Sequence, residues 1–171
     1  MSKAFVKEDT PGSVEVLPDR EVLPHANLVT VEGLAQIDAN IAKLQEEQAN
    51  SSEGDAPSVA RDLRYWIARR ATAQLTPNSD VSQVKFGSRV MVERDDGRRE
   101  TYRIVGTDEA DPKRGTLSYV SPLAQALIDR EIGAAVEVGG TRRKIVEISC
   151  RDLSARLASL GIGAPPSRPA Q

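Results

Sequence analysis

The sequence has 171 residues, a formal net charge of -2 at pH 7 and 28% charged residues, which indicates an ordinary folded chain rather than an electrostatic nucleic-acid binder. The single cysteine, Cys150, excludes an intramolecular disulfide and a cysteine-based zinc cluster, and the single His25 removes most histidine-based catalytic arrangements. No apolar run approaches the roughly 20 residues that cross a bilayer, and the N-terminus lacks the pattern of a secretory signal, so we expect a cytoplasmic protein.

The first 29 residues predict a flexible leader. Pro11, Pro18 and Pro24 are scattered among charged residues without hydrophobic periodicity. Such a segment buries too little apolar surface to fold by itself, so we place the first structured element after residue 29.

Residues 30–76 predict two amphipathic helices that form an antiparallel hairpin, or short coiled coil. Thr30 suits the N-cap of the first helix, and Ser58 suits the cap of the second, after turn-forming residues 50–57. Each helix is expected to be about 25–29 Å long at 1.5 Å per residue. The predicted apolar seam comprises Leu34, Ile37, Ile41 and Leu44 in the first helix and Val59, Leu63 and Ile67 in the second.

After a linker over 77–82, residues 83–149 predict a small antiparallel sheet domain with one short helix. Alternation at Val84, Phe86, Val90 and Val92 indicates strands, and the sequence Asp-Asp-Gly at 95–97 suits a tight hairpin turn. Ser121 and Pro122 suit the cap and first position of the short helix. Further strands are expected at 102–105, 117–120, 135–138 and 142–148, and residues 150–171 are expected to form a largely disordered tail. The predicted fold class is therefore α+β.

Two stretches of this domain resemble the GreA/GreB transcript cleavage factors. Residues 102–111 read YRIVGTDEAD and residues 118–128 read SYVSPLAQALI. The segment 28–34 also looks like the opening of that family's first helix, so the resemblance covers about residues 28–149. It implies an FKBP-like C-terminal domain that docks at the rim of the RNA polymerase secondary channel, with a coiled coil that enters the channel.

In that family, acidic residues at the tip of the coiled coil help to hold a catalytic metal ion in the polymerase. The resemblance therefore implies no catalytic residue, no metal site and no cofactor in the chain itself, but Mg²⁺ shared with the polymerase active centre. The implied partner is RNA polymerase, with nascent RNA or DNA contacted only inside the transcription complex. We expect no membrane partner and a monomer.

The arm departs from the family in its length and in its tip. It is shorter, and the acidic residues Glu53 and Asp55 do not reproduce the family's tip motif. Three interpretations stay open for this pair: a solvated loop, a metal-assisting role, or an electrostatic one. Arg61 and Arg64 share a helix face, which suits contacts to RNA phosphates or the polymerase, or an ordinary solvated surface.

The candidate polymerase-binding residues lie in the sheet domain. Ser121 and Pro122 occupy the corner that the resemblance assigns to docking, although they also suffice as a helix start. The acidic loop with Asp108, Glu109 and Asp111 suits either turn capping or a basic partner surface.

These features predict a regulatory factor that docks at the secondary channel and inserts a short hairpin, similar to the short-armed nucleoside diphosphate kinase regulators. The alternative is an active cleavage factor that uses its tip carboxylates. A remote alternative is an FKBP-like peptidyl-prolyl isomerase, which the small number of aromatic residues in the sheet domain disfavours.

Overall fold

The structure is a computed structural model, and it describes residues 17–22, 24–52 and 54–150. Most of the expected leader, Glu53 and all but the first residue of the expected tail lie outside these ranges. The described chain forms two compact units. Among the described residues, one unit contains 17–22, 24, 37–52 and 54–71, and the other contains 25–36 and 72–150.

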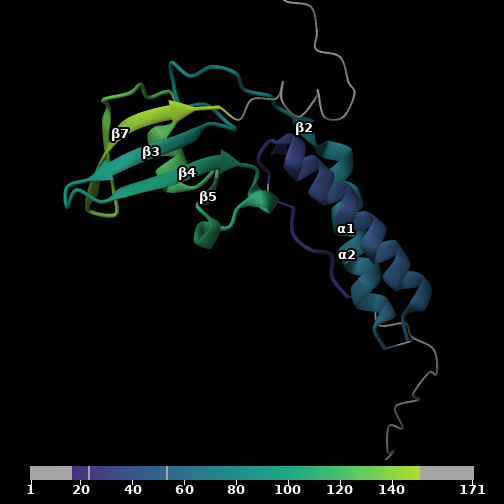
Figure 1. The fold of residues 1–171 in the computed structure, drawn as a ribbon. Helices are drawn as coiled ribbons and strands as arrows, with labels where there is room; N and C mark the ends of the chain where they lie inside the picture. Colours follow the sequence, from purple (N-terminus) through teal and green to yellow (C-terminus); the bar gives the residue numbers. More distant parts are fainter. Residues whose placement is uncertain (1–16, 23, 53, 151–171) are drawn as a thin grey trace, which may run out of the picture. The chain divides into compact units, whose positions relative to one another are not determined.

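The hairpin consists of α1 (Val31–Asn50) and α2 (Ala56–Thr72), which run side by side in Figure 1. The prediction that Thr30 caps the first helix is confirmed, because its hydroxyl accepts a hydrogen bond from the Gly33 N–H at 3.1 Å. The second helix begins two residues before Ser58, so the prediction of Ser58 as its cap is wrong. The N–H groups of Asp55 and Ala56 donate to the Ser52 carbonyl, and this turn starts the helix earlier.

The predicted seam is correct except at its last position. Ile37 and Leu63 are buried, and most other predicted positions are half-buried. Ile67 is 49% exposed and does not belong to the seam. Ile67 follows Val59 by two steps of four residues. In a helix with 3.6 residues per turn, these steps rotate the side-chain direction by about 80° in total, which turns Ile67 outward.

The second unit contains a five-stranded mixed sheet with the order β5-β4-β3-β7-β6. The strands are β3 (Arg89–Arg94), β4 (Arg99–Val105), β5 (Thr116–Ser118), β6 (Ala135–Val138) and β7 (Thr141–Ser149). The α+β class is confirmed, but the prediction of an entirely antiparallel sheet is wrong. Strand β5 runs parallel to β4, because two short 3-10 turns, Thr107–Glu109 and Pro112–Arg114, carry the chain back before it re-enters the sheet.

The start of the sheet also differs from the prediction. The β3–β4 hairpin turns at 95–97 as expected, with Gly97 at φ 78°. Val84 and Phe86 are buried but lie outside any strand, so their alternation does not mark a strand. Gly87, at φ 85°, breaks the segment, and the hydroxyl of Ser88 accepts the Lys85 N–H at 3.0 Å in place of a strand partner.

The core of this unit lies on one face of the sheet, under the short helix α3 (Pro122–Leu127). The helix start is confirmed: the Ser121 hydroxyl accepts from the Ala124 N–H at 3.4 Å, and Pro122 occupies the first position. Fully buried side chains include Val90, Val92, Ile104, Leu127 and Ile145. The face of β3, β4 and β5 that points away from this core is called the outer face below.

A two-stranded parallel pair, β1 (Leu28–Val29) with β2 (Gln74–Leu75), was not expected from the sequence. It joins the segment before α1 to the segment after α2. The second helix therefore ends at Thr72, before the end of the range 30–76 that was predicted for the hairpin. No helix in the described part of the chain combines the length and the apolar character that crossing a bilayer requires.

Candidate functional site

Glu109, in the predicted acidic loop, holds the beginning of α1. Its carboxylate accepts hydrogen bonds from the Thr30 N–H at 2.9 Å, the Thr30 hydroxyl at 2.5 Å and the Gly106 N–H at 3.3 Å. A carboxylate is favourable beside the N-terminus of a helix, where backbone N–H groups lack partners inside the helix. Hydrogen bonds to an ionised carboxylate are also stronger than neutral ones. Glu109 therefore acts as a clamp on the first turn of α1.

Two glycines make room for this clamp. A Cβ atom on Gly33 would lie 2.0 Å from the Glu109 carboxyl carbon. A Cβ atom on Gly106 would lie 2.5 Å from the Leu28 carbonyl oxygen. Both positions therefore need a residue without a side chain. In the sequence, Gly33 was the one available sign of this close contact. Glycine inside a helix costs about 1 kcal/mol relative to alanine, which indicates that close packing requires it there.

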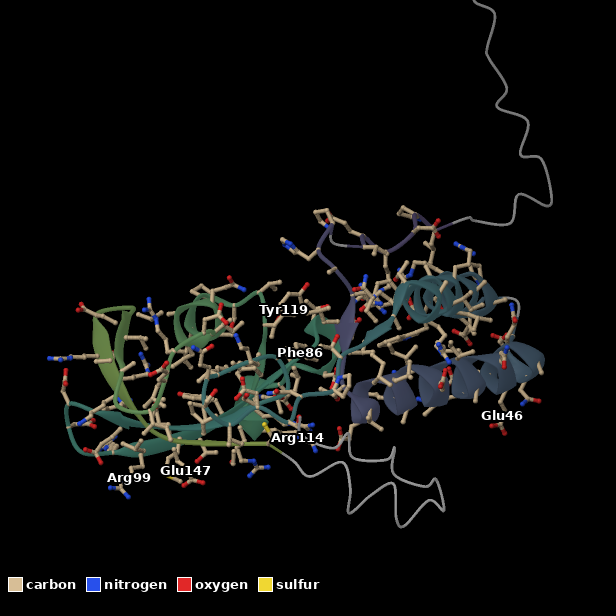
Figure 2. The ribbon with its side chains drawn as sticks, turned by 90° about the horizontal axis from the view of Figure 1, so that it is seen from above. Glu46, Phe86, Arg99, Arg114, Tyr119 and Glu147 are labelled. Carbon is tan, nitrogen blue, oxygen red and sulfur yellow. The ribbon has the colours of Figure 1, made fainter. Side chains whose placement is uncertain are left out.

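Further contacts tie residues 26–33, called the arm root below, to the sheet. The Arg103 guanidinium is 3.0 Å from the Glu32 carboxylate, and the Arg103 side chain is only 17% exposed. The Tyr119 hydroxyl donates to the Ala26 carbonyl, and the same ring packs edge-to-face on Phe86 at 5.9 Å (Figure 2). With the clamp and the β1–β2 pairing, these contacts give the arm root four independent attachments within its own unit.

The other acidic-loop residues also have structural tasks. The Asp111 carboxylate accepts from the Lys113 N–H at 3.0 Å and caps the second 3-10 turn. The Asp111 N–H donates to the Thr116 hydroxyl at 2.7 Å, which fixes the entry to β5. Asp108 is half-buried. The loop is thus an ordered element in which at least two of the three carboxylates cap backbone groups.

The corner formed by Ser121 and Pro122 is the part of the predicted docking surface that faces solvent. Ser121 is half-buried, whereas Pro122 and Gln125 are exposed. The Gln125 amide donates to the Tyr119 carbonyl at 2.6 Å, which holds the helix start against the strand end before it. The exposed residues at this corner, Pro122 and Gln125, are uncharged.

At the hairpin tip, Asp55 is exposed and its carboxylate accepts from the Ser52 hydroxyl at 2.8 Å. It stands immediately before α2, and its backbone carbonyl accepts from the Ser58 N–H at 3.1 Å and the Val59 N–H at 3.2 Å. Glu46 also projects near this end of the hairpin (Figure 2). Within residues 17–22, 24–52 and 54–150, no three His, Cys, Asp or Glu side chains are arranged to hold a metal ion.

The two arginines predicted to contact RNA or polymerase are engaged with carboxylates of their own unit. Arg61 lies 2.9 Å from Asp62, and Arg64 lies 2.8 Å from Asp19. Such partly exposed pairs are worth little, so they would exchange readily for another anion. The structure therefore places both arginines at the surface but does not leave them without partners.

A charged cluster on the core side of β4 has shifted titration behaviour. The Glu100 carboxylate accepts from the Tyr102 hydroxyl at 2.8 Å and from Arg94 at 3.1 Å, and Arg143 lies 3.6 Å away. The Tyr102 hydrogen bond, followed by the two guanidinium groups, holds the pKa of Glu100 below its usual value. Burial, followed by the neighbouring carboxylate, raises the pKa of Tyr102. This cluster suits a structural role in the sheet.

Comparison with known proteins places these features in a recognisable group. The family model for the C-terminal domain of the transcription elongation factors GreA/GreB matches residues 78–149. The transcription elongation factor GreA of Sinorhizobium medicae is 44% identical over 85 residues, which are 47% of this chain and 53% of the relative. GreA of a Caulobacter species is 39% identical over 113 residues, 58% of this chain and 72% of the relative.

Among solved structures, a GreA/GreB factor from Nitrosomonas europaea is 18% identical and covers 71% of this chain and 98% of its own, with a TM-score of 0.38. A score below 0.5 does not establish a shared fold. The chain spans about half the length of the first curated relatives that it matches. The sequence relatives therefore carry the assignment, and the solved structures do not.

Proposed function

Because the chain belongs to the GreA/GreB family of transcription elongation factors, we propose that it binds bacterial RNA polymerase and regulates elongation. The observation that carries the proposal is the clamp at Glu109. It lies inside the region that matches the family model, and it fixes the first turn of a helical arm. A domain that both matches the family and anchors an arm suits a factor that docks outside the polymerase and reaches inward.

The docking surface in this proposal is the corner at Ser121 and Pro122, in an FKBP-like domain seated at the rim of the secondary channel. The exposure of Pro122 and the hydrogen-bonded cap at Ser121 support it. Asp108 and Asp111 contribute further, charged contacts to the polymerase in this proposal. Glu109 acts indirectly, as a positioning residue for the arm, because its carboxylate is occupied by the arm root.

The arm in this proposal is a short coiled coil that enters the channel. Its helices contain 20 and 17 residues, which correspond to about 30 and 26 Å at 1.5 Å per residue. The Asp55 carboxylate accepts a hydrogen bond from the Ser52 hydroxyl, which competes with metal coordination and favours a factor that occupies the channel without driving cleavage. Cleavage assisted by Asp55 and Glu53, with Mg²⁺ shared with the polymerase, is the competing mechanism.

The partner in this proposal is RNA polymerase, and RNA or DNA is contacted only inside the transcription complex, with Arg61 and Arg64 as the available cations. The protein acts in the cytoplasm as a monomer and holds no cofactor of its own. The expectation that it is not an enzyme agrees with its membership in a family of elongation factors.

Affinity purification of the full chain with RNA polymerase tests the proposal. We expect the wild type to retain polymerase, and Pro122→Glu to weaken retention about tenfold or more, as expected for a central contact. Pro77→Glu makes the same change at an exposed proline outside the docking corner and should retain polymerase normally. Failure of the wild type to retain polymerase, or equal retention by both variants, would refute the docking proposal.

A further inference from the structure

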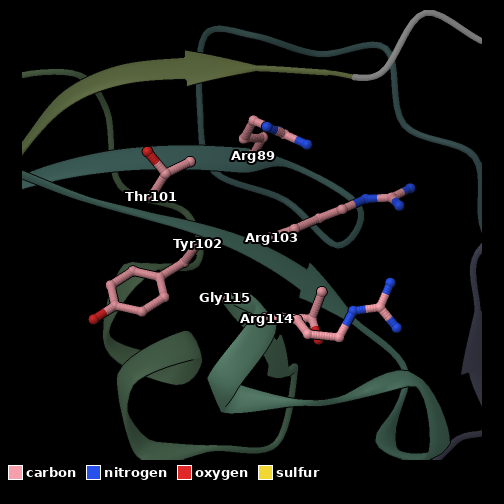
Figure 3. Close-up of a pocket in the computed structure, with 7 residues that line it drawn as sticks. Arg89, Thr101, Tyr102, Arg103, Arg114 and Gly115 are labelled. Atoms are coloured by element: carbon pink, nitrogen blue, oxygen red, sulfur yellow. The ribbon is translucent and has the colours of Figure 1, made fainter.

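The outer face of the sheet carries a basic pocket that the proposed docking corner does not use. Its volume is about 370 Å³. Three arginines, two threonines and a glycine form most of its wall: Arg89, Arg103, Arg114, Thr101, Thr116 and Gly115. Figure 3 shows the three arginine side chains extending in one direction, whereas the ring of Tyr102 extends the other way. All of these residues belong to the sheet unit, so the pocket is complete within it.

Strand register builds this pocket. Arg89 lies opposite Arg103 in the β3–β4 pair, and Arg103 lies opposite Thr116 in the β4–β5 pair, so one row of side chains crosses three strands. The turn before β5 adds Arg114. Gly115, at φ 72°, packs so closely that a Cβ atom would lie 2.9 Å from the Thr101 carbonyl oxygen. The Arg103 N–H donates to the Gly115 carbonyl at 2.9 Å, so the turn is fixed against β4.

The pocket carries more positive charge than the neighbouring carboxylate of Glu32 neutralises. Arg103 is paired with Glu32, yet its Nε atom is buried without a hydrogen-bond partner. In the described part of the chain, the guanidinium groups of Arg89 and Arg114 form no ion pair or hydrogen bond. Two guanidinium groups therefore share one concave surface with a third that is already neutralised. Like charges gathered in this way repel unless an anion lies between them.

We propose that this pocket binds the phosphate group of a small phosphate monoester. A guanidinium presents a planar fork of donors that matches phosphate oxygens, and such paired contacts are among the strongest hydrogen bonds in proteins. A phosphate monoester carries about -1.5 to -2 charges at pH 7, which matches the two unpaired guanidinium groups. A carboxylate carries a single charge and would leave one of them unbalanced.

The volume limits the size of the ligand. Small-molecule sites range upward from about 300 Å³, so this pocket is large enough for a phosphate with a small organic body and too small for a segment of folded protein. Inorganic phosphate and the phosphate of a mononucleotide share the required chemistry. The site stands independently of polymerase binding, because it uses none of the residues at Ser121 and Pro122.

Titration of the full chain, followed by amide chemical shifts, tests this site. Inorganic phosphate and a nucleoside 5′-monophosphate are added separately, at constant ionic strength maintained with chloride. We expect saturable shifts at residues 89, 101–103 and 114–116. Equal affinity for both ligands would identify phosphate itself as the recognised unit, and tighter binding of the monophosphate would show that the body also contributes. The unphosphorylated nucleoside should give no shifts there.

Matched variants identify the residues responsible. The double variant Arg89→Gln/Arg114→Gln should weaken phosphate binding at least tenfold, because each charge-assisted contact is worth a factor of that order. Arg130→Gln removes the same charge from an exposed arginine outside the pocket and should leave binding unchanged. Shifts that chloride reproduces, binding of the bare nucleoside, or equal loss in both variants would overturn the proposal.

Discussion

At the arm root, Glu109 bonds to Thr30 across 79 positions of sequence, whereas at the hairpin tip Asp55 bonds to Ser52 only three positions away. The root clamp is part-buried and joins a loop of the sheet unit to a helix start. The tip contact is exposed and local. Long-range buried contacts resist local opening, and short-range exposed contacts resist it little. The arm root is thus held by a contact from far along the sequence, whereas the contact at the hairpin tip is local.

The largest loss of stability is expected from Glu109→Ala. This change leaves the N–H and hydroxyl of Thr30, which is 5% exposed, without their acceptor. Unsatisfied buried groups cost about 1–3 kcal/mol, so the free energy of unfolding of the sheet unit should fall by about 2–3 kcal/mol. Urea denaturation measures this value. A loss below about 0.5 kcal/mol, typical of surface changes, would show that the clamp does not stabilise the root.

Gly33→Ala should be the next most damaging change. Alanine normally stabilises a helix by about 1 kcal/mol relative to glycine, but here the added methyl group would meet the Glu109 carboxyl carbon. Forced overpacking costs about 1–3 kcal/mol, so we expect net destabilisation in urea denaturation. In the double variant with Glu109→Ala the obstacle is gone, and the loss should be smaller than the sum of the two single losses. Additive losses would contradict the proposed contact.

The Glu100 cluster predicts a pH dependence in the body of the sheet. Because its folded pKa is lowered, its carboxylate stabilises the fold at pH values above its unfolded pKa, near 4.5. This contribution is lost as the pH falls through the lower, folded pKa. Unfolding free energies measured from pH 7 downward should therefore decline more steeply in the wild type than in Glu100→Gln. Parallel pH profiles of the two proteins would show that Glu100 does not cause the pH dependence.

The smallest loss of stability is expected from Asp55→Ala at the hairpin tip. The change removes the exposed hydrogen bond from the Ser52 hydroxyl to the Asp55 carboxylate, which is worth about 0.5–1 kcal/mol. Urea denaturation of this variant, compared with that of Glu109→Ala, tests the contrast between root and tip directly. A loss at Asp55 as large as the loss at Glu109 would show that the two ends are held equally firmly.

Sequence reasoning succeeded where the signal is local. Thr30 caps α1 and Ser121 caps α3 as predicted, because each cap involves an N–H three residues away. The parallel direction of β5 and the position of Val84 outside a strand were missed, because both depend on loops that no short pattern specifies. Ile67 was misplaced because its apolar character fits the seam while the geometry of the helix turns it outward.

The candidate site shows the same limit. The acidic loop was recognised, but the role of Glu109 was not, because its partner lies at the start of a distant helix. The basic pocket was also missed. Arg89, Arg103 and Arg114 are dispersed in sequence and converge only through strand register and the turn at Gly115. Side-chain clusters that form through strand register can be recognised only when the structure or the sheet topology is known.

We propose, as the central claim, that the chain binds RNA polymerase and occupies its secondary channel without driving transcript cleavage. The most direct measurement adds the full chain to backtracked transcription complexes that contain a full-length GreA factor and Mg²⁺, and follows the rate of RNA shortening. The claim predicts that cleavage slows as the chain is added, and that Pro122→Glu weakens this inhibition. Faster cleavage that depends on Asp55, or a rate unaffected at saturating chain, would contradict it.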